Sequence, residues 1–244
     1  LCLILAFSKY RHCLDRFSLC MENLGNNPNS LLYYNLIVFV LFKNPSDGSQ
    51  SQLNLQTMLE QDLINSVFYP DPFLKAGFIS KLVQDTKLEV LYLDLDLLYS
   101  GYVVSGTIPT EKNLTLFQPT TETLYKMIKE ILVKASLSQT IIIVDSLNGL
   151  FNMLNRKKNI GKTVMSIMML LASMAKMTKS YLVVTSMVRY KKEEGWILSP
   201  TGKRLIETKN SKKILLEHGK DGIVLNMPSD SCKLVIPSNL IPLV

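Results

Sequence analysis

The sequence has few of the residues from which metal centres and nucleophilic triads are built. Its 244 residues include two histidines, His12 and His218, and four cysteines, none of them in a CxxC pair. A His-based metal site or a Ser/His/Asp triad therefore has few candidates, and neither a disulfide framework nor a zinc site is supported. A nucleophile elbow and paired carboxylates in a glycosidase-like context are also missing.

Long apolar runs are scarce as well. The stretch Leu31–Phe42 spans about twelve residues, short of the roughly twenty that a membrane helix needs. Leu1–Phe7 lacks the basic region and the small-residue cleavage site of a signal peptide. We therefore expect no membrane partner and a cytoplasmic protein, with association with the nucleoid as an alternative.

Residues 1–57 are expected to form an N-terminal extension and linker, and residues 58–244 one core domain. The first residue is Leu1, which suggests a non-standard start codon, a fragment or a start assigned too far upstream, with Met21 or Met58 as the initiator. The extension is interpreted as a buried or interfacial hairpin or helix. Asn44 to Gln56 is rich in Gly, Ser, Gln and Asn, which is typical of a linker.

From Leu63 onward, apolar strand patterns alternate with helical patterns, which is typical of crossover units around a buried parallel sheet. The expected strands are Leu63–Tyr69, Leu88–Leu95, Asn113–Gln118 at an edge, Gln139–Asp145 and Tyr181–Thr185. The expected helices are Gly77–Asp85, Thr121–Lys134 with an N-cap at Thr120 or Thr121, and Lys162–Lys179. Lys212–Glu217 and Gly222–Met227 are expected to pair as an antiparallel hairpin. The sequence therefore predicts an α/β domain.

Asp145 and Ser146 follow the most apolar expected strand, at the edge where open α/β sheets bind ligands. An Asp in this place can hold a magnesium-bound water, although many such residues only cap the next helix.

Four segments, in this order, resemble the core of RecA/RadA-type recombinases and their paralogues. They are LYLDLD (91–96), IIIVDSLNGLF (141–151), which is similar to the Walker B strand, YLVVTSMV (181–188) and SPTGKRLIETKNSKKILLEHGKDG (199–222). The resemblance extends over most of residues 61–228. It implies a RecA-like P-loop NTPase core, in which helices flank a mostly parallel sheet that ends in an antiparallel hairpin.

The resemblance also implies roles for single residues. Asp145 and Ser146 stand where the family holds magnesium and nucleotide. Asp96 stands where the family has the carboxylate that activates the attacking water, and it is one methylene shorter than the usual Glu. Lys75 stands at the place of the phosphate-loop lysine.

The phosphate-binding loop itself is degenerate. In place of GxxxxGK[ST], residues 69–76 read YPDPFLKA, and only Lys75 survives. Two prolines remove N–H donors, Asp71 repels phosphate, Leu74 replaces a glycine and Ala76 lacks the hydroxyl. The glutamine that senses the γ-phosphate in the family corresponds to Met187. ATP and magnesium are therefore expected to bind weakly or not at all, with little hydrolysis.

Two other patterns are interpreted without a ligand. Gly161-Lys162-Thr163 ends like a phosphate loop, but it lies about ten residues beyond the strand and has Arg156 at the upstream glycine position, so it is taken as a basic helix start. The methionines of the following helix are taken as core residues rather than a cofactor box. They are Met165, Met168, Met169, Met174 and Met177.

The formal charge of +7 favours a polyanionic partner, with a solvated basic surface as the alternative. The resemblance places two DNA-facing loops on basic segments, where Tyr190 and Trp196 could stack on unpaired bases. The first holds Arg156, Lys157, Lys158 and Lys162. The second holds Arg189, Tyr190, Lys191, Lys192 and Trp196, with Lys203 and Arg204 further on. Glu193 and Glu194 temper the charge of the second loop.

These observations favour an accessory protein of homologous recombination and DNA repair. Its expected partners are single-stranded DNA and a RecA/RadA-type recombinase or paralogue subunit. A KaiC/RecA-like regulatory module that acts through protein contacts is one alternative. An active ATPase with an atypical phosphate loop is another.

Overall fold

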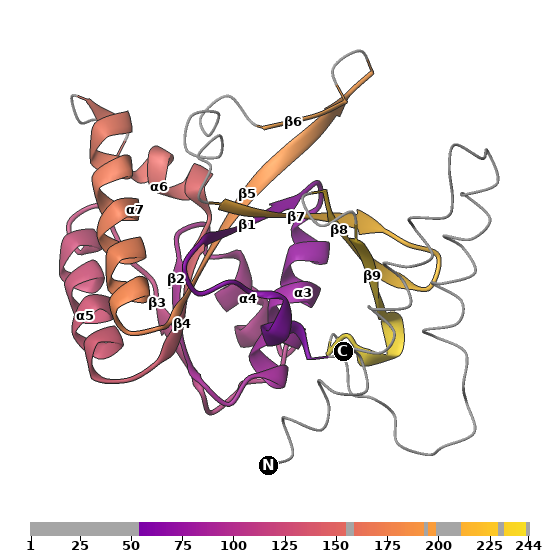
Figure 1. The fold of residues 1–244 in the computed structure, drawn as a ribbon, viewed down its shortest axis with the longest axis horizontal. Helices are drawn as coiled ribbons and strands as arrows, with labels where there is room; N and C mark the ends of the chain where they lie inside the picture. Colours follow the sequence, from indigo (N-terminus) through magenta and orange to yellow (C-terminus); the bar gives the residue numbers. More distant parts are fainter. Residues whose placement is uncertain (1–53, 155–158, 193–194, 199–210, 229–231, 243–244) are drawn as a thin grey trace, which may run out of the picture. The chain divides into compact units, whose positions relative to one another are not determined.

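The computed structural model describes residues 54–154, 159–192, 195–198, 211–228 and 232–242 (Figure 1). The strands are β1 (Ile64–Tyr69), β2 (Glu89–Asp94), β3 (Leu114–Phe117), β4 (Thr140–Asp145), β5 (Tyr181–Lys191), β6 (Gly195–Leu198), β7 (Ser211–His218), β8 (Gly222–Met227) and β9 (Cys232–Pro237). The helices are α3 (Pro72–Asp85), α4 (Leu98–Val104), α5 (Leu124–Leu137), α6 (Leu147–Met153) and α7 (Ile160–Met177), with 3-10 turns η1 (Leu55–Met58) and η2 (Ser238–Leu240).

The described strands form one sheet in the order β3-β2-β4-β5-β1-β7-β8-β9, and β6 pairs with the end of β5. Strands β3, β2, β4, β5, β1 and β7 are parallel, whereas β8 and β9 continue the sheet antiparallel. The predicted α/β fold class is confirmed: helices flank a mostly parallel sheet that ends in an antiparallel hairpin. The expected edge position of β3 is confirmed as well.

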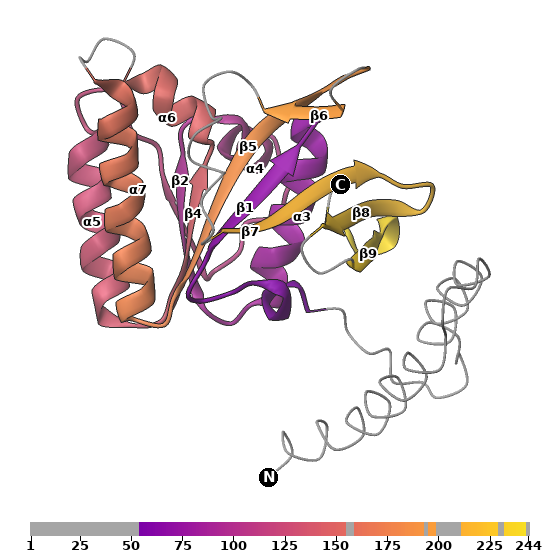
Figure 2. The ribbon, with the colours of Figure 1, turned by 45° about the horizontal axis from the view of Figure 1, so that its top comes forward.

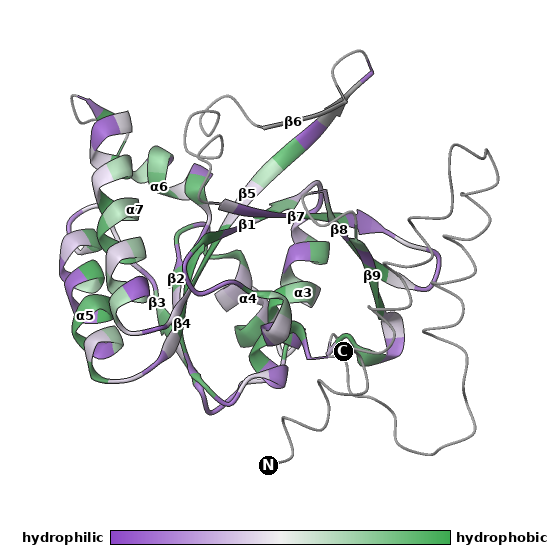
Figure 3. Cartoon of the chain, viewed as in Figure 1, coloured by the Kyte–Doolittle hydropathy of each residue, from purple (hydrophilic) through white to green (hydrophobic). Residues whose placement is uncertain are grey.

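Alternate residues of the central strands pack into two apolar layers, one on each face of the sheet. Along β4, Ile142 and Val144 face α5, α6 and α7, whereas Ile141 and Ile143 face α3 and α4. Figure 2 shows the two helix groups on opposite sides of the sheet. Because β4 is buried on both faces, its sequence is an unbroken apolar run, as the hydropathy colouring in Figure 3 shows for the central strands.

Several element boundaries differ from the sequence prediction. α3 begins at Pro72, five residues earlier than expected, because Asp71 caps the helix and proline suits the first helical position. α5 has its N-cap at Thr123 instead of Thr120 or Thr121, because residues 121–123 form a turn. β5 extends to Lys191, since its polar end pairs with β6.

The packed core reaches back to Leu55, which is 1% exposed and lies in the same apolar layer as α3. Its backbone N–H donates to the carboxylate of Asp85 at 3.1 Å. The core therefore includes residues that precede the expected boundary at residue 57. The rest of the expected extension lies outside the described residues.

α7 is only in part the core helix that its methionines predicted. Met168 is buried, but Met169 and Met177 are 64% and 79% exposed, so the interpretation of all five as core residues is wrong for these two. By length and composition α7 could cross a membrane, yet Val164 and Leu171 pack on the sheet like residues of a core helix. The outer side of α7 carries three exposed apolar side chains, Met169, Leu170 and Met177, among polar ones.

Candidate functional site

Four polar side chains meet at the carboxyl edge of the parallel strands, on the face covered by α3. The Nζ of Lys75 lies 2.8 and 2.7 Å from Oδ1 and Oδ2 of Asp145. The hydroxyl of Thr185 donates to Oδ1 and that of Tyr92 to Oδ2, so both carboxylate oxygens accept two hydrogen bonds. All four residues are 0% exposed. We call them the Lys75–Asp145 network.

The register of the strands explains this meeting. Asp145 is opposite Asp94 of β2, and it follows Val144, which is opposite Val184 of β5. Tyr92 comes two residues before Asp94 and therefore lies on the same face of the sheet. Lys75 reaches this edge from the second turn of α3, directly after β1.

Charge, rather than solvation, keeps Lys75 protonated. Burial by itself lowers the pKa of its ammonium group, but the Asp145 carboxylate and the neighbouring Tyr69 outweigh that effect and hold the pKa above its ordinary value. Lys75 also lies 4.9 Å from the centre of the Tyr69 ring. Burial raises the pKa of Tyr69 to about 12 and that of Tyr92 well above its usual range. The phenols of Tyr69 and Tyr92 therefore stay neutral at physiological pH.

Ser146 joins this network to the start of α6. Its hydroxyl donates to Oδ2 of Asp96 at 2.6 Å and accepts the backbone N–H of Gly149 at 3.1 Å, which caps the helix. The Asp145–Ser146 peptide bond is cis. From α6, the side chain of Asn148 accepts the N–H of Met187 on β5 at 3.3 Å. The start of α6 is thus bonded to the strand that continues into the β5–β6 hairpin.

Asp94 is a second buried carboxyl group at this edge. Its Oδ2 accepts the N–H of Ser100 at 2.8 Å, whereas Oδ1 has no hydrogen-bond partner among the described residues. Burial raises the pKa of Asp94, and the hydrogen bonds from Ser100 oppose that rise. A buried oxygen without a donor favours the protonated form of this carboxyl group.

The sequence-predicted pocket residues are therefore neighbours. Lys75 contacts Asp145, and Ser146 contacts Asp96. The sequence analysis missed Tyr92 and Thr185, which complete the network. The alternation of side chains along a strand could have identified both, because Tyr92 and Thr185 lie on the same face of the sheet as Asp145 and at or near its position along the strands.

These residues do not fit a magnesium–nucleotide complex. Both oxygens of Asp145 are already taken by Lys75, Tyr92 and Thr185, which leaves no free lone pair for a magnesium-bound water. Only Pro70 and Asp71 connect β1 to α3, too few to wrap a phosphate. Within the described ranges, no group of three His, Cys, Asp or Glu side chains is placed to hold a metal ion.

The residues expected to face DNA are only partly described. Lys162 is exposed at the start of α7, and Arg189 and Lys192 are exposed at the end of β5 and beyond it. The second expected loop is in part a hairpin: Tyr190 of β5 pairs with Trp196 of β6, and Arg189–Lys191 are strand residues. Arg156, Lys157, Lys158, Lys203 and Arg204 lie outside the described residues.

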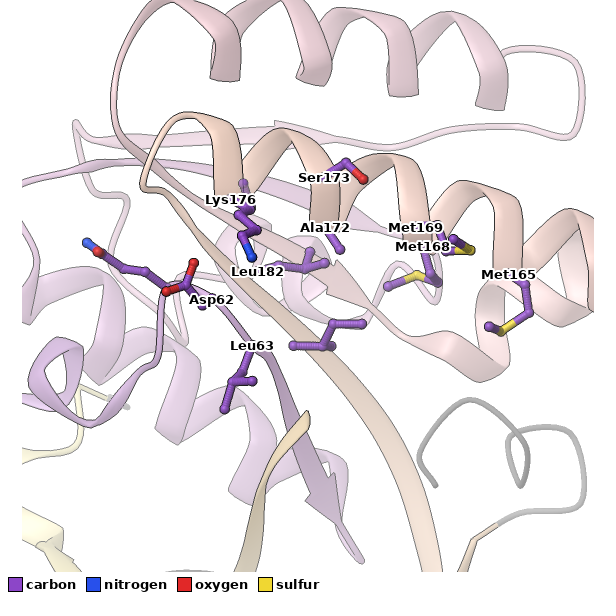
Figure 4. Close-up of a pocket in the computed structure, with 12 residues that line it drawn as sticks. Asp62, Leu63, Met165, Met168, Met169, Ala172, Ser173, Lys176 and Leu182 are labelled. Atoms are coloured by element: carbon purple, nitrogen blue, oxygen red, sulfur yellow. The ribbon is translucent and has the colours of Figure 1, made fainter. Parts of the chain in front are cut away.

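An apolar groove of about 350 Å³ lies between α7 and the amino ends of β1 and β5. Figure 4 shows Met165, Met168 and Met169 along one end of it, with Lys176 and Asp62 at the other. The groove adjoins the exposed apolar side of α7. The site residues at the opposite edge of the sheet take no part in it.

Comparison with known proteins does not show a family for this chain. No family model matches the chain, and no curated protein matches it. Among solved structures, the chain is similar to one described as the crystal structure of the RadB recombinase, with 13% identity and a TM-score of 0.49 over 69% of this chain and 82% of that one. A likeness at this level carries no argument about activity.

Proposed function

We propose that this protein is a RecA-like accessory protein of recombination and DNA repair that binds single-stranded DNA, a recombinase-type partner subunit, or both, without turning over ATP. The observation that carries the proposal is a pairing of features at one edge of the sheet. Three basic side chains are exposed near the carboxyl ends of the strands, where the resembled family faces DNA: Lys162, Arg189 and Lys192. At the same edge, Lys75 forms a buried ion pair with Asp145 and is not exposed. Exposed Lys and Arg side chains at an edge where Lys75 is already bonded to Asp145 suit phosphate contacts rather than hydrolysis.

The decisive measurement is the affinity for a labelled single-stranded oligonucleotide over a range of salt concentrations. Charge reversal of Lys162, Arg189 and Lys192 is expected to weaken binding and to flatten the slope of log affinity against log salt by about 2, since each phosphate contact on a single strand contributes roughly 0.7. The chain offers a matched control in Lys87, Lys112 and Lys179, which are exposed at the amino ends of β2, β3 and β5. Reversing these three charges changes the net charge of the protein by the same amount, but at the opposite edge of the sheet.

The same assay applies to the basic segment 156–158. Charge reversal of Arg156, Lys157 and Lys158 is expected to act like reversal of the described set. If both sets leave the affinity and its salt slope unchanged relative to the control, the nucleic-acid role fails.

The second candidate is a KaiC/RecA-like regulatory module that acts through protein contacts. The apolar side of α7, where Met169, Leu170 and Met177 are each about half exposed or more, favours it. Absence of DNA affinity together with a co-purifying protein partner would support this alternative. Either role is proposed for the cytoplasm, and the first also for the nucleoid. Phosphate release from ATP well above background would instead indicate an active ATPase with an atypical loop.

A further inference from the structure

The amino end of α3 is occupied by a charge of the protein itself. Helix N-termini attract anions, and in nucleotide-binding relatives of this fold a phosphate lies at the helix that follows the first strand. Here the Asp71 carboxylate accepts the N–H of Phe73 at 2.8 Å, and Pro72 contributes no N–H. Nε2 of His218 lies 3.3 Å from the other oxygen of Asp71. The carboxylate therefore sits where an incoming phosphate would have to bind.

The cationic half of the site is occupied in the same way. The Lys75 ammonium group lies on both oxygens of Asp145, the carboxylate that a magnesium-bound water would need. Moving Lys75 to a phosphate would leave a carboxylate at 0% exposure without its counter-ion. Tyr92 and Thr185 donate to the same two oxygens, so their hydrogen bonds also keep a metal ion or a metal-bound water away from Asp145.

We propose that the protein fills its own nucleotide pocket: the Asp71 carboxylate takes the place of a phosphate, and the Lys75 ammonium takes the place of a metal ion on Asp145. The carboxyl edge of the sheet is then held in a single state that needs no nucleotide. This inference goes beyond the proposed function, because it concerns what stabilises the core and holds whether or not the protein binds DNA.

The test is thermal unfolding of the full chain with Mg–ATP and, separately, with inorganic tripolyphosphate. A ligand present at a hundred times its dissociation constant raises the Tm of a domain of this size by roughly 5–10 °C. The wild type is expected to show no such rise with either compound. A rise of that size with Mg–ATP, lost in Lys75→Ala, would overturn the proposal.

A second variant tests the anionic half by opening it. Asp71→Ser keeps a side chain that caps helices but removes the charge, so the variant should fold. Its Tm is expected to rise with tripolyphosphate, because the carboxylate that repels an added anion at the amino end of α3 is gone. Glu130→Gln, on the exposed side of α5, removes one negative charge elsewhere and is expected to behave like the wild type. If Asp71→Ser gains no response over this control, Asp71 does not occupy an anion site and the proposal fails.

Oligonucleotide binding measured on the same samples separates this inference from the proposed function. Wild-type protein that is stabilised by Mg–ATP but still binds single-stranded DNA would refute the self-filled pocket alone. Protein that ignores Mg–ATP and also ignores DNA would refute the DNA-binding role alone.

Discussion

Lys75 and Asp145 depend on each other, because each is a buried charge whose counter-ion is the other. Removing one partner of such a pair leaves an uncompensated charge and typically costs about 3–5 kcal/mol. Lys75→Met and Asp145→Asn are each expected to lower the free energy of unfolding by about that amount. The double variant has no unpaired charge and should lose less than the sum, with a coupling energy of roughly 0.5–3 kcal/mol.

Urea denaturation of the four proteins checks this coupling, and strictly additive losses would contradict it. The pH of the measurement follows from the raised pKa of Lys75. A cation whose pKa is higher in the folded protein contributes its full stabilisation below the ordinary value of 10.5, and loses it as the pH rises through the folded value. The cycle measured near neutral pH therefore reports the whole contribution of the Lys75 charge.

The charged form of Asp94, unlike that of Lys75, destabilises the folded protein. Because burial raises its pKa above the ordinary 3.8, the folded protein binds this proton more readily than the unfolded chain does. Above the raised pKa, the buried charge of Asp94 lowers the free energy of unfolding by its full amount. As the pH falls through that pKa towards 3.8, Asp94 binds a proton in the folded protein and this destabilisation disappears. We expect the stability of the wild type relative to Asp94→Asn to rise as the pH is lowered across this window. Denaturation curves of both proteins at several pH values test this, and a difference that does not vary with pH would contradict it.

At the scale of elements, α6 packs against the β2–α4 connection only because residue 149 has no side chain. A Cβ at Gly149 would lie 2.5 Å from Oδ1 of Asp96 and 2.8 Å from Cβ of Leu95. Gly149→Ala is therefore expected to destabilise the protein by about 1–3 kcal/mol, as overpacking usually does. It should also disturb the Asp96–Ser146 hydrogen bond.

α4 provides the matched control, since Gly101 is a helical glycine whose added Cβ would meet nothing within 4 Å. Gly101→Ala is expected to stabilise the protein by roughly 0.5–1 kcal/mol through its better helix propensity. Thermal or urea unfolding of the two variants measures both effects. Equal changes in the two would show that the close approach at Gly149 has no energetic weight.

The elements predicted correctly from the sequence are those whose pattern is set by burial. β4 and β2 are apolar on both faces, and the buried residues of α5 recur at helical spacing. The sequence therefore predicted these three elements within a few residues of their observed ranges. α4 and α6 were missed because seven residues are too few to show a helical period. The end of β5 was missed because Arg189–Lys191 pair with β6 beyond the central sheet, and their charged sequence does not resemble an apolar strand.

The site could be predicted only as far as topology determines it. Parallel strands bring their carboxyl ends to one edge, which is why Lys75, Asp96, Asp145 and Ser146 were expected together and are found together. The contacts that those side chains make depend on distances between atoms in the folded protein, and the spacing of residues along the sequence does not determine these distances. The donation of Tyr92 and Thr185 to Asp145 is a consequence of packing, and it decides whether the carboxylate is open to a metal ion or closed.

At the scale of the whole molecule, the apolar layer beside α3 shows where the folded core begins. Leu55 is buried in it, and the Thr86 hydroxyl donates to the side chain of Gln56 at 2.8 Å. A chain that begins at Met58 loses both contacts, as well as the bond from the Leu55 N–H to Asp85. A chain that begins at Leu53 keeps all three.

The shorter chain is therefore expected to be less stable than the longer one by about 2–5 kcal/mol, the usual cost of losing a buried leucine side chain. Urea denaturation of the two truncated chains measures this difference. Leu55→Ala in the full-length chain is the matched comparison, and it should reproduce most of the loss because it removes the same buried side chain while keeping the backbone. If the truncated chains unfold at the same urea concentration and Leu55→Ala has no effect, η1 lies outside the cooperative core, and the boundary at residue 57 is then the correct one.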